Sequence, residues 1–322
     1  MKAYKYYALA SVVVGAFGMA SAHAETISVV VKDTTSPYWQ TVMAGACNAG
    51  KELNATVNVT GPTSEADIAG QISILENAVS TGSQAILLAP SSSDGLGAAV
   101  DEAGAKVPVF LIDSAANSTA FKSLIATDNK AGGVLAGKAL AEAIKKKNGA
   151  AKGTVAIISY GPGINTLDER IAGFKEGLAE TPEIEIVTTR VGDFQTTTAL
   201  NQANDVLSAF PQLDGIYADA LFTGIGSAQA ISEAGRKGNP VLVTFDSSDT
   251  LEQNLRDGVV QALVVQNPYK MGYDGIANAL KSLKGEDVPA RIDTGVTVIT
   301  SDNVDSAEAK SLLHPDFSCL QQ

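Results

Sequence analysis

Histidine and cysteine are scarce in this chain, which has two of each among 322 residues. His23 lies in an N-terminal stretch with the features of an export signal, so His314 is the one histidine of the expected mature chain. That scarcity excludes a Ser/His/Asp or Cys/His set for nucleophilic catalysis and a Cys/His spacing for zinc. The sequence also lacks a Walker loop, and no Gly-x-Gly-x-x-Gly motif opens the first predicted helix, so the common nucleotide-binding motifs are excluded.

Long hydrophobic runs are absent after the N-terminus, so we predict no membrane-spanning helix there. At the N-terminus, Lys2 and Lys5 precede an apolar stretch at 8–20, and Ala22-His23-Ala24 fits a small-residue cleavage site. The apolar stretch is shorter than the roughly 20 residues that a spanning helix needs. We therefore predict a secretory signal peptide at 1–24 rather than a membrane anchor.

Positively charged residues are also few: the chain has 23 Lys and Arg residues against 35 Asp and Glu residues, which gives a formal net charge of −12. An acidic surface of this kind argues against nucleic acid and anionic membranes as partners.

The two cysteines, Cys47 and Cys319, would enter an oxidising compartment after export, where a pair more often forms a disulfide than a metal or redox site. We predict that they form a bridge tying the tail to the first domain; two buried free thiols are the alternative.

The expected mature chain alternates short β-branched runs with longer helical patterns. About 300 residues exceed one typical core, and two βα series of similar length follow each other without a Pro/Ser-rich linker. This pattern predicts an α/β protein with two similar Rossmann-like lobes, each a parallel sheet flanked by helices. The expected strands lie at 27–31, 57–60, 85–89, 109–112, 124–126, 155–159, 184–191, 215–218, 241–245, 262–265 and 296–299.

Polar side chains follow several of these strands, at the sheet edge where small ligands bind in open α/β folds. They are Lys32, Asp113, Asp219, Asp246 and Gln266, and Ser36, Tyr38, Trp39, Arg170, Phe194 and Phe222 lie at the starts of helices or in neighbouring loops. Carboxylates and amides bind hydroxyl groups, and aromatic faces cover the C–H patches of a sugar ring, so the mixture favours a neutral polyhydroxyl ligand. For each carboxylate the alternative is a helix N-cap, and a glycosidase pair of two carboxylates is an alternative for the set.

Five short motifs resemble those of the periplasmic sugar-binding proteins of the ribose-binding type, over essentially the whole mature length. They are Val31-Lys32 through Pro37-Tyr38-Trp39, which is similar to the allose-binding form, Ala126-Thr127-Asp128-Asn129, Arg170-Ile171-Ala172-Gly173-Phe174, Phe245-Asp246 and Val265-Gln266-Asn267-Pro268. The resemblance implies a type I fold whose lobes are joined by three crossings, near 127–128, 265–266 and 294–295. The N-terminal lobe would comprise 25–127 and 266–294, and the C-terminal lobe 128–265 and 295–322.

The resemblance also implies roles for the residues at the sheet edges. Tyr38 and Trp39 would cover one face of a sugar and Phe194 the other, whereas hydroxyl groups would be bound by Lys32, Asp113, Arg170, Asp246 and Gln266. The sequence departs from the family pattern at Ser36, Ser114 and Ala220, where Asn, Arg and Asn are usual. Asp219, beside Ala220, is our own candidate for the function of the missing Asn.

The implied function is that of an extracytoplasmic receptor for a pentose, a hexose such as allose or psicose, or a polyol. Such a receptor closes around its ligand without a cofactor and delivers it to an ABC import permease in the inner membrane. It would act in the periplasm as a monomer, and a chemoreceptor is a further candidate partner. A secreted carbohydrate-active enzyme and a receptor for a furanose-like signalling molecule are the alternatives; a transcription repressor is disfavoured by the export signal and by the lack of a DNA-binding headpiece.

Overall fold

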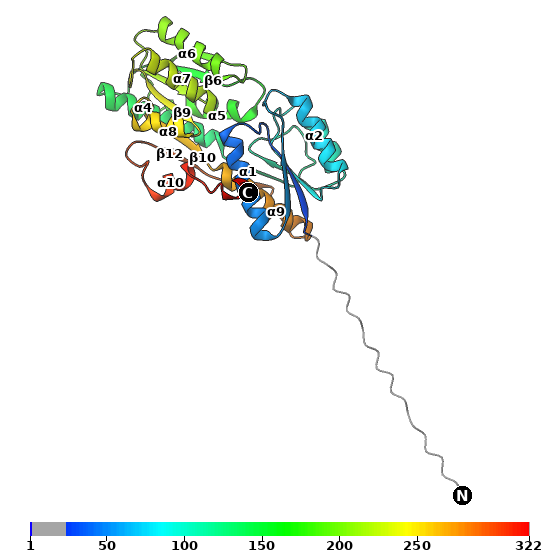
Figure 1. The fold of residues 1–322 in the computed structure, drawn as a ribbon. Helices are drawn as coiled ribbons and strands as arrows, with labels where there is room; N and C mark the ends of the chain where they lie inside the picture. The colour runs from blue at the N-terminus through cyan, green and yellow to red at the C-terminus, as the bar shows by residue number, and fades with distance from the viewer. Residues whose placement is uncertain (2–23, 322) are drawn as a thin grey trace.

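The β-branched runs of the sequence form two six-stranded sheets in the computed structural model, which describes Met1 and residues 24–321 (Figure 1). One sheet has the strand order β11-β5-β4-β3-β1-β2, and the other has the order β12-β10-β9-β8-β6-β7. All pairings are parallel except that of β10 with the edge strand β12. The first sheet contains β1 (Thr26–Val30), β2 (Thr56–Thr60), β3 (Ala85–Leu88), β4 (Val109–Ile112), β5 (Ser123–Ala126) and β11 (Arg291–Asp293). The second contains β6 (Gly153–Ser159), β7 (Ile184–Val191), β8 (Gly215–Ala218), β9 (Val241–Phe245), β10 (Ala262–Gln266) and β12 (Val296–Ile299).

Helices cover both faces of each sheet, as the near-continuous burial of the central strands requires. The first sheet is covered by α1 (Pro37–Leu53), α2 (Ile68–Ser80), α3 (Gly97–Gly104) and α9 (Pro268–Leu283). The second is covered by α4 (Asn129–Asn148), α5 (Asn165–Leu178), α6 (Thr196–Ala209), α7 (Leu221–Glu233), α8 (Asp249–Arg256) and α10 (Ala307–Leu313). A 3₁₀ turn at Ser318–Gln321 follows α10.

Each sheet therefore has a separate apolar core on either side. In the first, α1 and α9 bury side chains such as Trp39 and Ile276 on one face, while α2 and α3 bury Leu75 and Val100 on the other. In the second, α4 and α5 pack on one face and α6, α7, α8 and α10 on the other. The cores make each lobe a rigid body, so any large movement between them falls on the connecting segments.

The chain passes between the two sheets three times: from β5 to α4, from β10 to α9, and from β11 to β12. Thr127 and Thr294, which lie on two of these crossings, have their hydroxyl oxygens 3.4 Å apart. The predicted fold class, with two similar Rossmann-like lobes joined by three segments, is confirmed. We propose that the lobe boundaries lie at these crossings, as predicted, although residues beyond α10 return to the first lobe and contact α1.

Two features of the structure were not predicted from the sequence, and one prediction cannot be compared with it. The segment after β12, which the sequence suggests is a polar tail, contains α10, whose start is capped by the hydroxyl of Ser306 accepting from the Ala309 amide at 3.1 Å. The three-residue edge strand β11 was not predicted. The predicted signal peptide lies, apart from its two end residues, outside the part of the chain that the structure describes, and no described helix is long and apolar enough to cross a membrane.

Helices α4 and α5 touch through glycines, which brings the backbone of α5 close enough to position Arg170 on its second turn. A Cβ added at Gly173 would lie 2.0 Å from the carbonyl oxygen of Lys130, and one at Gly133 would lie 2.2 Å from the carbonyl oxygen of Arg170. Neither clash can be relieved by rotating a side chain, because the contacted atoms are backbone. The two helices must move apart if either glycine gains a side chain.

We therefore expect Gly173→Ala to lower the free energy of unfolding by about 1–3 kcal/mol, the usual cost of overpacking a core. Ala172→Ser, which adds one heavy atom to the exposed neighbouring position on α5, is the matched control and should change stability by less than about 0.5 kcal/mol. Urea unfolding of the two variants measures the difference. Equal stabilities would show that the close approach of α4 and α5 has no energetic role.

Candidate ligand-binding site

The carboxyl ends of the two sheets face each other across a cavity between the lobes. Strand ends, loops and the first turns of helices supply its walls, so residues far apart in the sequence meet there. The first lobe contributes Lys32, Ser36, Tyr38, Trp39, Glu65 and Asp113; the second contributes Tyr160, Ile164, Thr166, Leu167, Arg170, Ala220, Leu221, Phe222 and Asp246; Gln266 lies at the crossing after β10. This is the edge of an open α/β sheet where ligands generally bind.

A buried ion pair organises the first wall. The Lys32 ammonium lies 2.8 Å from Asp113 Oδ2 and donates to the Ser114 hydroxyl at 2.6 Å, while the Tyr38 hydroxyl donates to Asp113 Oδ1 at 2.8 Å. Burial alone would raise the pKa of Asp113, but the charge of Lys32 and hydrogen bonds from Lys32 and Ser114 lower it overall. The carboxylate is therefore held ionised, with both oxygens already oriented by protein donors.

Trp39 is one of the two aromatic residues of this wall, and contacts at its indole N–H and over its ring hold it in place. Its indole N–H donates to Glu65 Oε1 at 2.6 Å, and the Lys32 ammonium lies 5.3 Å from the ring centroid, within cation–π range. The Tyr38 ring packs edge-on against Trp39 at 4.9 Å. Burial raises the pKa of Glu65, more than the nearby Lys32 charge lowers it.

Arg170 is the centre of the opposite wall. It is 4 % exposed, its Nε donates to Asn129 Oδ1 at 2.8 Å, and its Nη1 donates to the Asp219 carbonyl at 2.8 Å. The same Nη1 lies 3.9 Å from Asp246 Oδ2, and the guanidinium carbon is 4.0 Å from the centroid of the Phe245 ring. Burial acts to lower the pKa of Arg170, but the charges of Asp246 and Asp113 raise it overall, so the side chain stays cationic.

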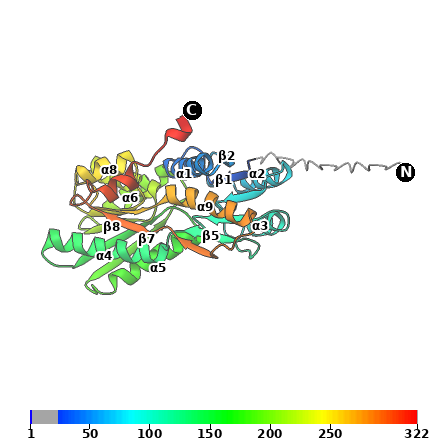
Figure 2. The same cartoon turned by 90° about the horizontal axis from the view of Figure 1, so that it is seen from below.

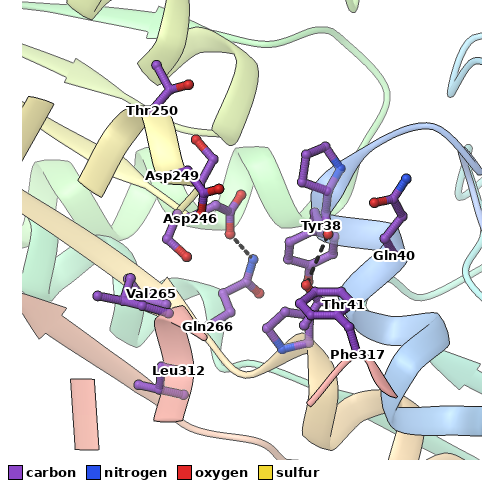
Figure 3. A pocket seen from close by; sticks show the side chains of 15 residues that line it. Tyr38, Gln40, Thr41, Asp246, Asp249, Thr250, Val265, Gln266, Leu312 and Phe317 are labelled. Atoms are coloured by element: carbon purple, nitrogen blue, oxygen red, sulfur yellow. Dashed lines mark hydrogen bonds between the residues drawn. The ribbon is translucent and has the colours of Figure 1, made fainter. Parts of the chain in front are cut away.

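Two buried polar atoms that line the cavity have no hydrogen-bond partner within the protein. The Gln266 side chain donates from Nε2 to Asp246 Oδ1 at 2.7 Å, which leaves its Oε1 free and directed into the space between the lobes (Figure 3). The Ser36 hydroxyl is the second such group, and both residues are 2 % exposed. Because buried polar groups are rarely left unpaired, these atoms mark positions where a bound molecule would supply partners.

Asp113 and Asp246 occupy equivalent places in the two lobes. Asp113 follows β4 and Asp246 follows β9, which are the third strands from the β11 and β12 edges of their sheets. Each aspartate has a positive φ, 65° and 66° respectively. Residues other than glycine are uncommon in this left-handed region, and such strain is often found at functional sites. Neither residue caps a helix: no helix starts directly after Asp113, and the N-cap of α8 is Ser248.

The structure brings eight of the ten predicted contact residues to this cavity and places the other two behind its wall. Phe194 packs edge-on against the Tyr160 ring at 5.4 Å and does not line the cavity. The Asp219 carboxylate is fully buried and accepts from the Tyr160 amide at 3.0 Å. Tyr160, Phe222 and the apolar residues around them form the surface where Phe194 was predicted.

Glu65 and Tyr160 are lining residues that the sequence reasoning missed. Glu65 lies in the loop before α2, where an acidic residue suggests a helix N-terminus rather than a partner for an indole. Tyr160 directly follows β6, as Lys32 nearly follows β1, so its place after a strand was a signal that could have identified it.

The buried carboxylate of Asp219 gives a pH-dependent prediction. Burial raises its pKa to about 6, above the value in an unfolded chain. The folded protein therefore binds this proton more tightly, and the contribution of Asp219 to the free energy of unfolding falls as pH rises from about 4 to about 6. We expect Asp219→Asn, relative to the wild type, to gain about 2–3 kcal/mol in unfolding free energy between pH 4 and pH 7.

Chemical denaturation at both pH values measures this difference. Asp101→Asn, which alters an exposed carboxylate on α3, serves as the control and should show no such gain. A constant difference between Asp219→Asn and the wild type at both pH values would contradict the prediction.

Comparison with known proteins identifies the family of this two-lobed structure. Residues 27–287 match the model of the periplasmic binding protein domain. The chain belongs to the periplasmic binding protein family. Its relatives are solute-binding proteins of transporters rather than enzymes. This periplasmic binding protein is accordingly not an enzyme, which argues against the alternative of a carbohydrate-active enzyme.

Three relatives show how much of this periplasmic binding protein the likeness covers. A carbohydrate transporter solute binding protein from Agrobacterium radiobacter, solved in complex with D-arabinose, is 43% identical with a TM-score of 0.89, covering 91% of this chain and 100% of that one. An ABC transporter solute binding protein from Agrobacterium vitis with bound D-fucose is 40% identical with a TM-score of 0.83, covering 90% and 100%. The ribose import binding protein of Salmonella typhimurium is 29% identical over 277 residues, covering 85% of this chain and 90% of that protein.

The predicted disulfide is present in the structure. Cys47 of α1 and Cys319 of the C-terminal 3₁₀ turn are bridged, with their Cα atoms 5.9 Å apart and a separation of 272 positions in sequence. The described part of this periplasmic binding protein has no free cysteine.

Proposed function

We propose that the protein is an extracytoplasmic receptor that binds one monosaccharide or related polyol between its lobes and delivers it to an ABC import permease. The observation that carries the proposal is the pair of unpartnered buried atoms, Ser36 Oγ and Gln266 Oε1, in a cavity with aromatic side chains on both walls. A hydroxyl group can donate to Gln266 Oε1 and can either donate to or accept from Ser36. A pyranose or furanose ring presents several hydroxyl groups around an apolar C–H surface, which suits Trp39.

The charges in the cavity support an uncharged ligand. Lys32 is paired with Asp113, and Arg170 lies beside Asp246, so the two cations are matched by two carboxylates. An anionic ligand would meet Asp113, Asp246 and Glu65, and a cationic ligand would meet Lys32 and Arg170. A polyhydroxyl molecule can instead donate to the carboxylates and accept from the cations without carrying a net charge.

The predicted contact set remains our proposal for the binding residues, with two changes of role. Lys32, Ser36, Tyr38, Trp39, Asp113, Arg170, Asp246 and Gln266 would contact the ligand, while Phe194 and Asp219 would support Tyr160 and Arg170 from behind. The D-arabinose, D-fucose and ribose in the names of relatives support a pentose or hexose as the ligand. Action in the periplasm as a monomer, with an inner-membrane permease as partner and a chemoreceptor as a further candidate, is part of the same proposal.

A thermal-shift screen against pentoses, hexoses, polyols and inositols tests the proposal. A ligand that binds only the folded state stabilises it by mass action, by about 2.7 kcal/mol at 100 times its dissociation constant. We expect a neutral, hydroxyl-rich compound to raise the midpoint of unfolding, and a hit confined to a furanose-like signalling molecule would favour that alternative. If only amino acids or metal ions shift the midpoint, the proposed function is wrong.

A further inference from the structure

The segment after α10 connects the two lobes a fourth time. At its start, α10 belongs to the second lobe: Ala309 is 1 % exposed and packs in the same apolar core as Leu251 and Ile299. The His314 imidazole Nε2, just beyond α10, lies 3.1 Å from Glu252 Oε2 on α8. The beginning of the segment is thus fixed to the second lobe by burial and by a polar contact.

Its other end is fixed to the first lobe. Cys319 is bonded to Cys47 on α1, and the Asn48 side chain donates from Nδ2 to the Asp316 carbonyl at 3.0 Å. The same Asn48 amide nitrogen lies 3.0 Å from the Tyr269 hydroxyl on α9, so the anchor involves both helices of that face. Figure 2 shows the red C-terminal segment leaving α10 and ending beside α1. We call residues 314–319 the strap.

The strap also borders the space beside the proposed ligand site. A cavity of about 400 Å³ lies between the start of α1 and the loop before α8, and Leu312 and Phe317 form part of its lining (Figure 3). Tyr38, Asp246 and Gln266 line both this cavity and the proposed ligand site. Separation of the lobes on this side would therefore pull the strap at both of its anchors.

The length of the strap limits that separation. Six peptide units connect Leu313, at the end of α10, with Cys319, and a fully extended chain spans at most about 3.6 Å per residue, or about 22 Å in all. Pro315 removes one backbone freedom from this short segment. The three backbone crossings allow one lobe to rotate relative to the other about the hinge. A strap that is bridged to α1 restricts this rotation on the α1–α8 side.

We propose that the disulfide-anchored strap limits opening of the lobes and thereby slows release of the bound ligand. The effect on release rests on the proposed function, while the limit on opening does not. Opening the bridge would add more widely separated conformations to the ligand-free ensemble, which would lower the fraction that is ready to bind and raise the apparent dissociation constant. A reducing environment would act in the same direction as removal of the cysteines.

Two variants separate restraint by the strap from simple stabilisation by a disulfide. Cys47→Ser/Cys319→Ser removes the bridge and its contribution to stability. The second variant keeps the bridge and inserts eight Gly and Ser residues between His314 and Pro315, which adds up to about 29 Å of reach. Small-angle X-ray scattering of the ligand-free proteins measures opening, and a chase experiment with a sugar found by the screen measures its dissociation rate.

We expect both variants to have a larger radius of gyration than the wild type and to release the ligand about tenfold faster, within the usual range of coupling between sites. The insertion variant should retain most of the thermal stability. If the insertion variant matches the wild type in radius and dissociation rate, the strap only stabilises the fold and the proposal is overturned. Expansion of both variants with no sugar bound in any would support the restraint while contradicting the proposed function.

Discussion

Replacement of Arg170 by alanine is expected to weaken ligand binding strongly and to destabilise the fold. The guanidinium faces the cavity, so the variant loses a charged donor to the ligand and leaves Asp246 buried without its cation. Truncating one member of a buried, hydrogen-bonded charge pair costs about 2–5 kcal/mol of binding free energy, or roughly 30- to several thousand-fold in affinity. Isothermal titration with a sugar found by the thermal-shift screen measures the loss.

The loss of stability has a separate origin within the second lobe. Without Arg170, Asn129 Oδ1 and the Asp219 carbonyl each lose a donor. Breaking a buried ion pair such as Arg170–Asp246 commonly costs about 3–5 kcal/mol of unfolding free energy. Binding must therefore be measured at a temperature where circular dichroism shows the native helix content. Arg170→Lys should recover part of the stability by restoring the charge but not the affinity, because an ammonium cannot reproduce the two directed guanidinium bonds.

Arg256→Ala is the matched control, because Arg256 also pairs with carboxylates but lies on the surface of α8, away from the cavity. Its removal should change stability far less than removal of Arg170 and should leave affinity unchanged. An Arg170→Ala variant that is folded and binds the sugar as tightly as the wild type would exclude Arg170 from the site.

The parts of the fold that follow from local pattern were predicted from the sequence. Continuous apolar runs such as 85–88 and 109–112, short and bounded by turn residues, indicate buried parallel strands, and their carboxyl ends fix where Asp113 and its counterparts lie. The strand-end position of Lys32, Asp246 and Gln266 likewise placed them at one sheet edge. The two successive βα series predicted the two lobes, and the resemblance to the ribose-binding type implied where the chain crosses between them.

The remaining features depend on contacts that no local pattern encodes. Phe194 was predicted to face the ligand, but the backbone turns there with φ of 67° and directs its ring against Tyr160. Glu65 reaches the cavity because its loop packs beside Trp39, a contact between residues 26 positions apart. The strand β11 has a single apolar residue, Ile292, and is formed only because β5 offers it a free edge.

Replacement of Lys32, the partner of Asp113, is expected to have the second large effect. It should reverse the sign of the pH dependence of the contribution that Asp113 makes to stability. In the wild type the pKa of Asp113 is lowered, so its ionised form contributes stability above the pKa of an unfolded aspartate, and that contribution is lost as pH falls through the folded pKa. Lys32→Met keeps the volume but removes the cation, so burial becomes the dominant influence and raises the pKa of Asp113 above the unfolded value. The variant should then gain stability as pH falls from 7 towards 4.

At pH 7 we expect Lys32→Met to lose about 3–5 kcal/mol of unfolding free energy, because it leaves an uncompensated carboxylate at a position 6 % exposed. Adding Asp113→Asn should restore most of this stability, since a neutral amide needs no counter-ion and can still accept from the Tyr38 hydroxyl. The cycle of single and double variants measures the coupling between the two residues. Ligand affinity should stay low in the double variant, because the charged donor and acceptor offered to the sugar are both gone. A double variant as unstable as Lys32→Met would show that the lysine acts through packing rather than through its charge.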